Sequence, residues 1–136
     1  MTDEPMTDEP MTDVEAIRRT LSEYGQLCDD GRFEEWGELF TPEATFSVLG
    51  HTYSGRDALK RFIEKGQPPE RRGKHAMVGS VIDLDGDQAR AVTDFVFVAR
   101  AGDELRITAA GRYHDMLVRE PDRWRFADRR IVMLGE

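Results

Sequence analysis

Apolar residues recur at three- and four-residue steps near the start of the chain, which is typical of one face of an α-helix. This apolar stripe consists of Val14, Ile17, Leu21, Tyr24 and Cys28. Thr12 precedes the stripe, and Glu15 lies three residues after Thr12. This is the arrangement of a capping box at a helix N-terminus. Gly31 is typical of the position just beyond a helix C-terminus. The pattern therefore predicts a helix between Thr12 and Gly31.

Shorter elements follow this helix. They are a second helix over residues 33–40, a strand over 44–49, a short strand at 52–53 and a third helix over 56–64. Thr41-Pro42 is expected to end the second helix, because proline cannot continue one. Ser54 is the expected cap of the third helix.

Four long runs rich in β-branched and aromatic residues follow the polar loop GQPPERRG. They cover residues 75–83, 88–100, 104–118 and 124–134, separated by the turn sequences DGD, AGD and EPDR. Connections this short join antiparallel strands. The order of elements predicts an α+β domain, in which N-terminal helices pack on one face of a curved, mostly antiparallel sheet.

Two carboxylates, Asp29 and Asp30, stand at the end of the first predicted helix, where the helix dipole favours cations. At about 100° per residue, Asp29 lies about 100° from the centre of the apolar stripe, whereas Asp30 points almost directly away from it. Asp29 is therefore placed at the edge of the buried face. Either it accepts hydrogen bonds from nearby backbone amides, or it has a partner elsewhere in the fold.

The length of 136 residues fits one domain with a substantial core. The formal net charge is −8, but four acidic residues lie in the repeat MTDEPMTDEP, so the rest of the chain carries only −4. This mild acidity argues against nucleic acid or an anionic membrane as a partner. The repeat is too short and polar to pack, so we expect residues 1–11 to be disordered and the folded domain to cover residues 12–136.

Cys28 is the sole cysteine, which excludes an internal disulfide. The acidic start of the chain has neither the positive charge nor the apolar core of a signal peptide. We therefore expect a cytoplasmic protein.

Three histidines are candidates for proton transfer. His51 lies beside a turn glycine, where it is expected to be solvated. His75 begins a strand with two largely apolar faces, so alternation alone does not assign its side chain to the core or to a cavity. His114 alternates with Tyr113 and Asp115. For each histidine, a structural or exposed position is the alternative to a catalytic role.

Five segments of the chain resemble the SnoaL-like branch of the NTF2-like superfamily. They are CDDGRFEEWGELFTPEATF, GRDAL, KHAMVGSVIDLDGDQA, GRYHDMLVR and WRFADRRIVML, which with the first helix cover nearly all of residues 14–134. The resemblance implies a cone fold, in which a strongly bent sheet wraps around helices and encloses a largely apolar pocket. That fold agrees with the order of elements predicted above.

Some enzymes of this superfamily, scytalone dehydratase and hexachlorocyclohexane dehydrochlorinase among them, pair a histidine at the start of the first long strand with an aspartate at the end of the first helix. The resemblance places that pair at His75 and Asp29. It also matches Arg129 to an arginine that polarises a leaving group, and Tyr24 to a position where the dehydrochlorinase-like proteins carry a lysine. The alternative for Tyr24 is a core aromatic residue. The resemblance implies no metal and no organic cofactor.

This pair predicts acid–base chemistry. Asp29 would select one imidazole tautomer, and His75 would abstract a substrate proton near neutral pH. A dehydration, another elimination or an isomerisation would follow. The predicted walls of a pocket for a small hydrophobic molecule, with the core as their alternative, are Phe95, Phe97, Tyr113 and Met133.

Apolar side chains on both faces of VTDFVFVA and IVML predict a homodimer or higher closed oligomer, because the helices can cover only one face of the sheet. In a monomer that face would instead be shielded by the aliphatic stems of Arg90, Arg100, Arg106 and Arg112. Three functions remain open at this stage: a cofactor-independent lyase or isomerase, a non-catalytic binder of a small apolar ligand, and an NTF2-like dimerisation module.

Overall fold

The computed structural model describes residues 10–136, so the prediction of disorder for residues 1–11 lies almost wholly outside the described residues. The helices are α1 (Asp13–Asp29), α2 (Phe33–Gly37) and α3 (Arg56–Gly66), with a short 3-10 helix, η1 (Pro69–Arg71). The strands are β1 (Phe40–Val48), β2 (His51–Ser54), β3 (Lys74–Asp85), β4 (Gln88–Ala101), β5 (Glu104–Arg119) and β6 (Trp124–Met133).

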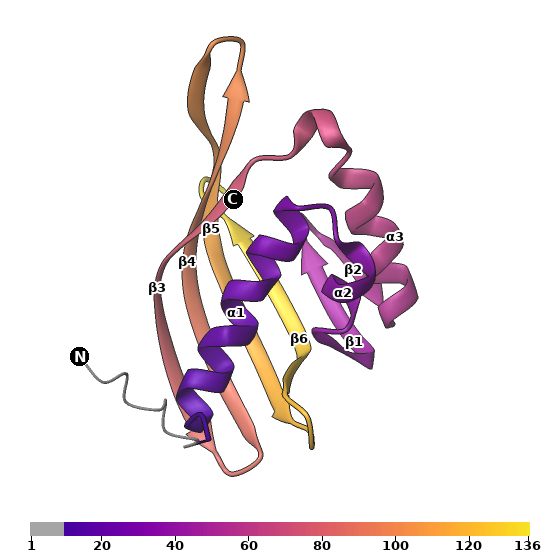
Figure 1. Cartoon of the computed structure of the whole chain (residues 1–136), viewed down its shortest axis with the longest axis vertical. Helices are drawn as coiled ribbons and strands as arrows, with labels where there is room; N and C mark the ends of the chain where they lie inside the picture. Colours follow the sequence, from indigo (N-terminus) through magenta and orange to yellow (C-terminus); the bar gives the residue numbers. More distant parts are fainter. Residues whose placement is uncertain (1–9) are drawn as a thin grey trace, which may run out of the picture.

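The six strands form one sheet in the order β2-β1-β6-β5-β4-β3. Strands β3 to β6 make the predicted antiparallel meander, and β1 joins it by pairing in parallel with β6. The sheet is curled but not closed. Helix α1 lies across one face, whereas α2 and α3 lie beside β1 and β2 (Figure 1). The predicted α+β class, with helices on one face of a curved sheet, is confirmed.

Helix α1 begins where the capping box predicts. Thr12 is the N-cap, and its side-chain oxygen accepts a hydrogen bond from the backbone amide of Glu15 at 3.1 Å. The predicted stripe supplies half of the buried residues of the helix, namely Ile17, Leu21, Tyr24 and Cys28. Gly31 has a φ of 71°, a left-handed conformation that glycine adopts at little steric cost and that ends the helix.

The second helix is shorter than its apolar pattern predicts. Helix α2 ends at Gly37, and Phe40 begins β1 instead of closing the helix. Phe40 pairs with Phe126 of β6, whose amide donates a hydrogen bond to the carbonyl of Leu39 at 2.8 Å. Pro42 lies in the irregular part of β1, where a strand tolerates a proline. An apolar run can be buried as helix or strand, so the pairing with a distant segment decided the conformation.

The predicted cap of the third helix was also wrong. Ser54 is the last residue of β2 and pairs with Thr45 of β1, so the strand ladder already holds its backbone. Helix α3 has Gly55 as its N-cap and no side-chain capping hydrogen bond.

Aromatic side chains fill the space between the helices and the sheet. The rings of Trp36, Phe40, Tyr113 and Phe126 have centroids 5.4–6.3 Å from that of Tyr24 on α1. All five side chains are at most 2% exposed. This packing occupies interior volume beneath α1 that the cone fold was expected to leave for a ligand.

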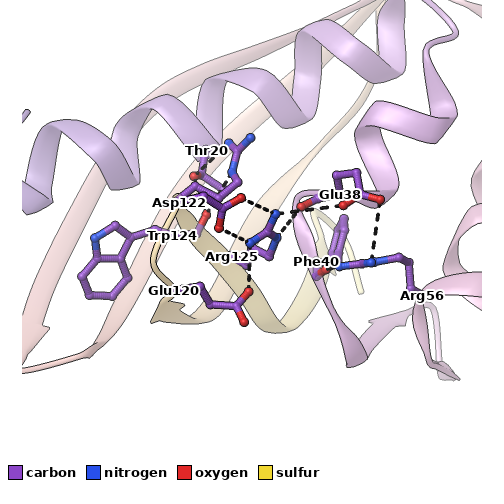
Figure 2. Close-up of polar contacts among 9 residues, drawn as sticks. Thr20, Glu38, Phe40, Arg56, Glu120, Asp122, Trp124 and Arg125 are labelled. Carbon is purple, nitrogen blue, oxygen red and sulfur yellow. Dashed lines mark hydrogen bonds and ion pairs between the residues drawn. The ribbon is translucent and has the colours of Figure 1, made fainter.

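A polar network joins the start of β6 to α2, β1 and α3 (Figure 2). Arg125 donates hydrogen bonds to Asp122 and to the backbone carbonyl of Glu38, both at 2.7 Å. Arg56, the first residue of α3, donates to the carbonyl of Phe40 at 3.1 Å. These bonds connect β6 and β1 to α3 and to the end of α2.

Candidate active site

Asp29 and His75 are hydrogen-bonded to each other at the contact between α1 and β3. The Asp29 Oδ1 lies 2.6 Å from the His75 Nδ1, and Oδ2 accepts a hydrogen bond from the His75 backbone amide at 3.0 Å. The side chains are 3% and 10% exposed. The hydrogen bonds to a strand residue account for the position of Asp29 at the helix end that disfavours carboxylates. Asp30, in contrast, is exposed as predicted.

Close packing positions this His75–Asp29 pair. Gly25 of α1 faces β3, and a Cβ at Gly25 would lie 3.1 Å from both the Cβ of His75 and the Cε of Met77. A side chain at Gly25 would require these neighbours to shift by a few tenths of an ångström. On the other side, Phe97 of β4 is the cross-strand neighbour of His75, and its ring centroid lies 4.6 Å from that of the imidazole.

The hydrogen bond determines which imidazole nitrogen is available for chemistry. A carboxylate can only accept hydrogen bonds, so the bond assigns the proton of a neutral His75 to Nδ1. Nε2 then carries the lone pair. Among the hydrogen bonds of residues 10–136, none involves Nε2. The pair is thus arranged as a base whose protonated form an adjacent carboxylate would stabilise.

Tyr24 lies on α1 next to this pair, with its ring centroid 6.1 Å from that of His75. It is 2% exposed. Burial raises the pKa of the Tyr24 phenol well above its ordinary value. The hydroxyl therefore remains a neutral hydrogen-bond donor over the physiological pH range. The structure also places Tyr24 at the centre of the aromatic core, which agrees with the alternative considered for it.

Arg129 is fully buried on β6. Its Nε and Nη2 donate to Asp115 of β5 at 2.8 and 3.0 Å, and Asp115 is its direct cross-strand neighbour. The guanidinium carbon lies 3.6–4.4 Å from the centroids of the Tyr113, Tyr24 and Phe126 rings. Within residues 10–136, Nη1 has no hydrogen-bond partner. Within the described part of the chain, Arg129 thus keeps the two N–H donors of Nη1 without a partner.

Asp115 was not identified from the sequence as a functional candidate. Its alternation with Tyr113 and Leu117 would have placed a carboxylate on the core face, where a cation is needed as a partner. Burial raises the pKa of Asp115, and the adjacent Arg129 cation opposes that rise.

Within residues 10–136, the four predicted pocket walls are divided between separate places: Phe95 and Met133 border one recess, and Phe97 borders another. Phe95 and Tyr113 are buried and stack on each other, with centroids 4.2 Å apart. Phe97 is half-buried against His75, and Met133 is half-buried near the end of β6. Their contact with a substrate stays a prediction.

The remaining candidates lie elsewhere. His51 is exposed, as expected, and His114 is half-buried on the face of the sheet opposite to Tyr113. Burial raises the pKa of the Cys28 thiol to about 12, so this cysteine is held as an unreactive thiol.

Among residues 10–136, no cluster of three or more acidic, histidine or cysteine side chains could hold a metal. No helix within those residues has the length and apolarity needed to span a bilayer.

A family model described as a SnoaL-like domain matches residues 9–130. An uncharacterised protein of Mycobacterium tuberculosis is 28% identical over 117 residues, which are 83% of this chain and 80% of that protein. A solved scytalone dehydratase-like protein of Novosphingobium aromaticivorans is 25% identical with a TM-score of 0.77, covering 88% of this chain and 83% of that one. An NTF2-like protein of the same organism, with a cystatin-like fold, is 24% identical with a TM-score of 0.83 and covers 90% and 82%. The predicted NTF2-like fold is confirmed.

Proposed function

Because the chain belongs to the SnoaL-like domain family, we propose that it is a cofactor-independent lyase or isomerase that acts on a small hydrophobic molecule through His75 and Asp29. The observation that carries this proposal is the 2.6 Å hydrogen bond between two buried side chains 46 positions apart in the sequence. Burying a titratable pair is costly unless its members satisfy each other. The resemblance of the fold to a scytalone dehydratase-like protein supports the same class of chemistry.

In the proposed reaction, the His75 Nε2 takes a proton from a carbon next to a carbonyl group of the substrate. The C–H electron pair moves into an enolate, while Asp29 stabilises the new imidazolium. In an elimination, the electron pair then forms a C=C bond as a leaving group departs from the adjacent carbon. In an isomerisation, His75 returns the proton to a different carbon. Tyr24 and the free Nη1 of Arg129 are the proposed donors to the developing negative charge.

Deuterium exchange tests the first step without knowledge of the natural substrate. The protein is incubated in D2O with a panel of cyclic ketones that carry either a β-hydroxyl group or a β,γ double bond. We expect proton NMR to show loss of the α-proton signal of at least one ketone faster than in buffer, followed by elimination or movement of the double bond. Exchange at the buffer rate across the whole panel would argue against the proposal.

We also propose that the sheet face turned away from α1 binds a second copy of the chain. This face is the observation that favours the alternative function, a dimerisation module. A recess of about 480 Å³ on this face has an apolar lining that includes Val78, Val96 and Leu134. Val78 is 67% exposed and Leu134 is 82% exposed. The ion pair of Asp94 with Arg112 borders the same recess, so the face carries both charges and is complementary to itself.

Light scattering tests this interface. The wild-type protein is expected at twice the chain mass of 15.6 kDa or more, and Val78→Asp is expected to shift the mass towards one chain, because it buries a charge in the interface. Leu49→Asp is the matched control, since Leu49 is 63% exposed in the turn between β1 and β2. A wild-type mass of one chain would rule out the oligomer.

A further inference from the structure

A recess of about 360 Å³ lies beside the His75–Asp29 pair, between η1 and the β4–β5 hairpin. The segment from α3 to β3, which contains η1, runs past the base of this projecting hairpin (Figure 1). Phe97 and Ala99 give the recess an apolar wall. Phe97 belongs to both places, because the same ring packs on the His75 imidazole at 4.6 Å. The recess and the pair are therefore separated by one aromatic side chain.

The charges that line this recess are mainly positive. Arg71, Arg72 and Arg100 contribute to the lining, and Glu70 is the one carboxylate among the lining residues. This excess of positive charge is unusual in a chain with a formal net charge of −8. An acidic chain has ample carboxylates with which to neutralise arginines, so three arginines around one recess indicate a binding site for an anion.

The guanidinium groups of Arg71 and Arg100 have no protein partner in the part of the chain that the structure describes. Arg112, for example, forms an ion pair with a neighbouring carboxylate. Within residues 10–136, neither Arg71 nor Arg100 has an ion pair or a side-chain hydrogen bond. Within the same residues, this also holds for Arg18 and Arg61, which lie outside the recess lining. The donors of Arg71 and Arg100 are free, and a guanidinium binds a carboxylate through two parallel hydrogen bonds.

Local packing holds this arrangement in place. A Cβ at Gly73 would collide with the carbonyl oxygen of Val98, so the segment after η1 lies directly against β4 and only glycine fits. The Arg72 Nε donates to the backbone carbonyl of Gln67 at 3.1 Å, which closes the turn around η1. The Gln67 side chain also lines the recess, and its buried Oε1 has no hydrogen-bond partner within residues 10–136. A ligand with a polar group would satisfy this atom, directly or after rotation of the amide.

We propose that this recess binds the carboxylate of an apolar, ring-containing substrate, with Arg71 and Arg100 holding the anionic group and Phe97 contacting the ring. The inference rests on the proposed function, because it places the substrate's acidic group at the rim and its reactive C–H on the side of His75. A substrate in the recess would have to displace the Phe97 side chain to reach His75, because that ring lies between the recess and the imidazole. The substrate class is then a hydrophobic carboxylic acid.

Binding of a matched pair of probes tests this site without any turnover. The isotope-labelled protein is titrated with 2-naphthoate and with the neutral 2-naphthamide, and backbone amide shifts of Phe97, Ala99 and Thr108 are followed by NMR. We expect 2-naphthoate to bind at least about tenfold more tightly than the amide, since two guanidinium groups receive its charge. The double variant Arg71→Gln/Arg100→Gln is expected to lose that preference.

The control is Arg18→Gln/Arg61→Gln, which removes the same net charge from two exposed arginines outside the recess lining and should keep the preference. Equal affinity of the wild-type protein for the two probes, or equal losses in the two double variants, would overturn the site. Titrating the His75→Asn variant with the same two probes distinguishes failure of the anion site from failure of the proposed reaction. If this variant still prefers 2-naphthoate while the wild-type protein exchanges no α-protons, the anion site stands and the proposed reaction fails.

Discussion

Replacing His75 with asparagine is expected to lower the kcat/KM of the proposed reaction by about 10²–10⁴-fold, the usual contribution of a positioned general base. Asparagine places an amide nitrogen near the position of Nδ1, so it can still donate a hydrogen bond to Asp29. It has no counterpart of the basic Nε2. The substitution therefore removes the base and keeps the contact between α1 and β3. Measurement requires the ketone that shows the fastest exchange, with circular dichroism to establish that the fold is retained.

Asp29→Asn is expected to cause a loss in the same range for a different reason. An amide in place of the carboxylate can donate to Nδ1, which favours the tautomer with the proton on Nε2 and blocks proton abstraction. The matched control is His114→Asn, because His114 lies on the opposite face of the sheet and should leave the rate unchanged. A His75→Asn protein with a rate within about twofold of wild type would exclude His75 as the base.

Asp115→Ala is expected to lower the free energy of unfolding by about 3–5 kcal/mol, because it leaves the fully buried Arg129 guanidinium without its carboxylate. The Arg129 side chain is fully buried, and its other neighbours are the faces of aromatic rings. Urea unfolding followed by tryptophan fluorescence measures the change.

Two further variants separate the loss of the ion pair from the exposure of an unpaired charge. The double variant Asp115→Leu/Arg129→Met replaces both charges with apolar groups and should be less destabilised than Asp115→Ala. Glu104→Ala removes the carboxylate of a solvent-exposed ion pair with Arg106 and should leave the unfolding midpoint nearly unchanged. If Asp115→Ala were as stable as Glu104→Ala, Arg129 would have to find another partner in the core.

The sequence alone determined the elements whose stability is local. The capping box at Thr12, the apolar stripe and Gly31 act within a few residues of one another, so the start and end of α1 could be predicted from them. Each strand of the meander was predicted from composition and from the turns that separate it from the next. The edge position of Asp29 on the helix followed from helical geometry, which is also local.

The tertiary structure decided what depends on contacts between distant segments. Phe40 became a strand residue because Phe126 pairs with it, and Ser54 joined a ladder instead of capping a helix. The partner of Arg129 depended on the register between β5 and β6, which alternation within one strand does not define. The resemblance proposed that Asp29 meets His75, but the 2.6 Å contact requires the close crossing of α1 over β3 that Gly25 permits. Such contacts arise from the packing of whole elements, whose relative positions are not encoded in any one local pattern.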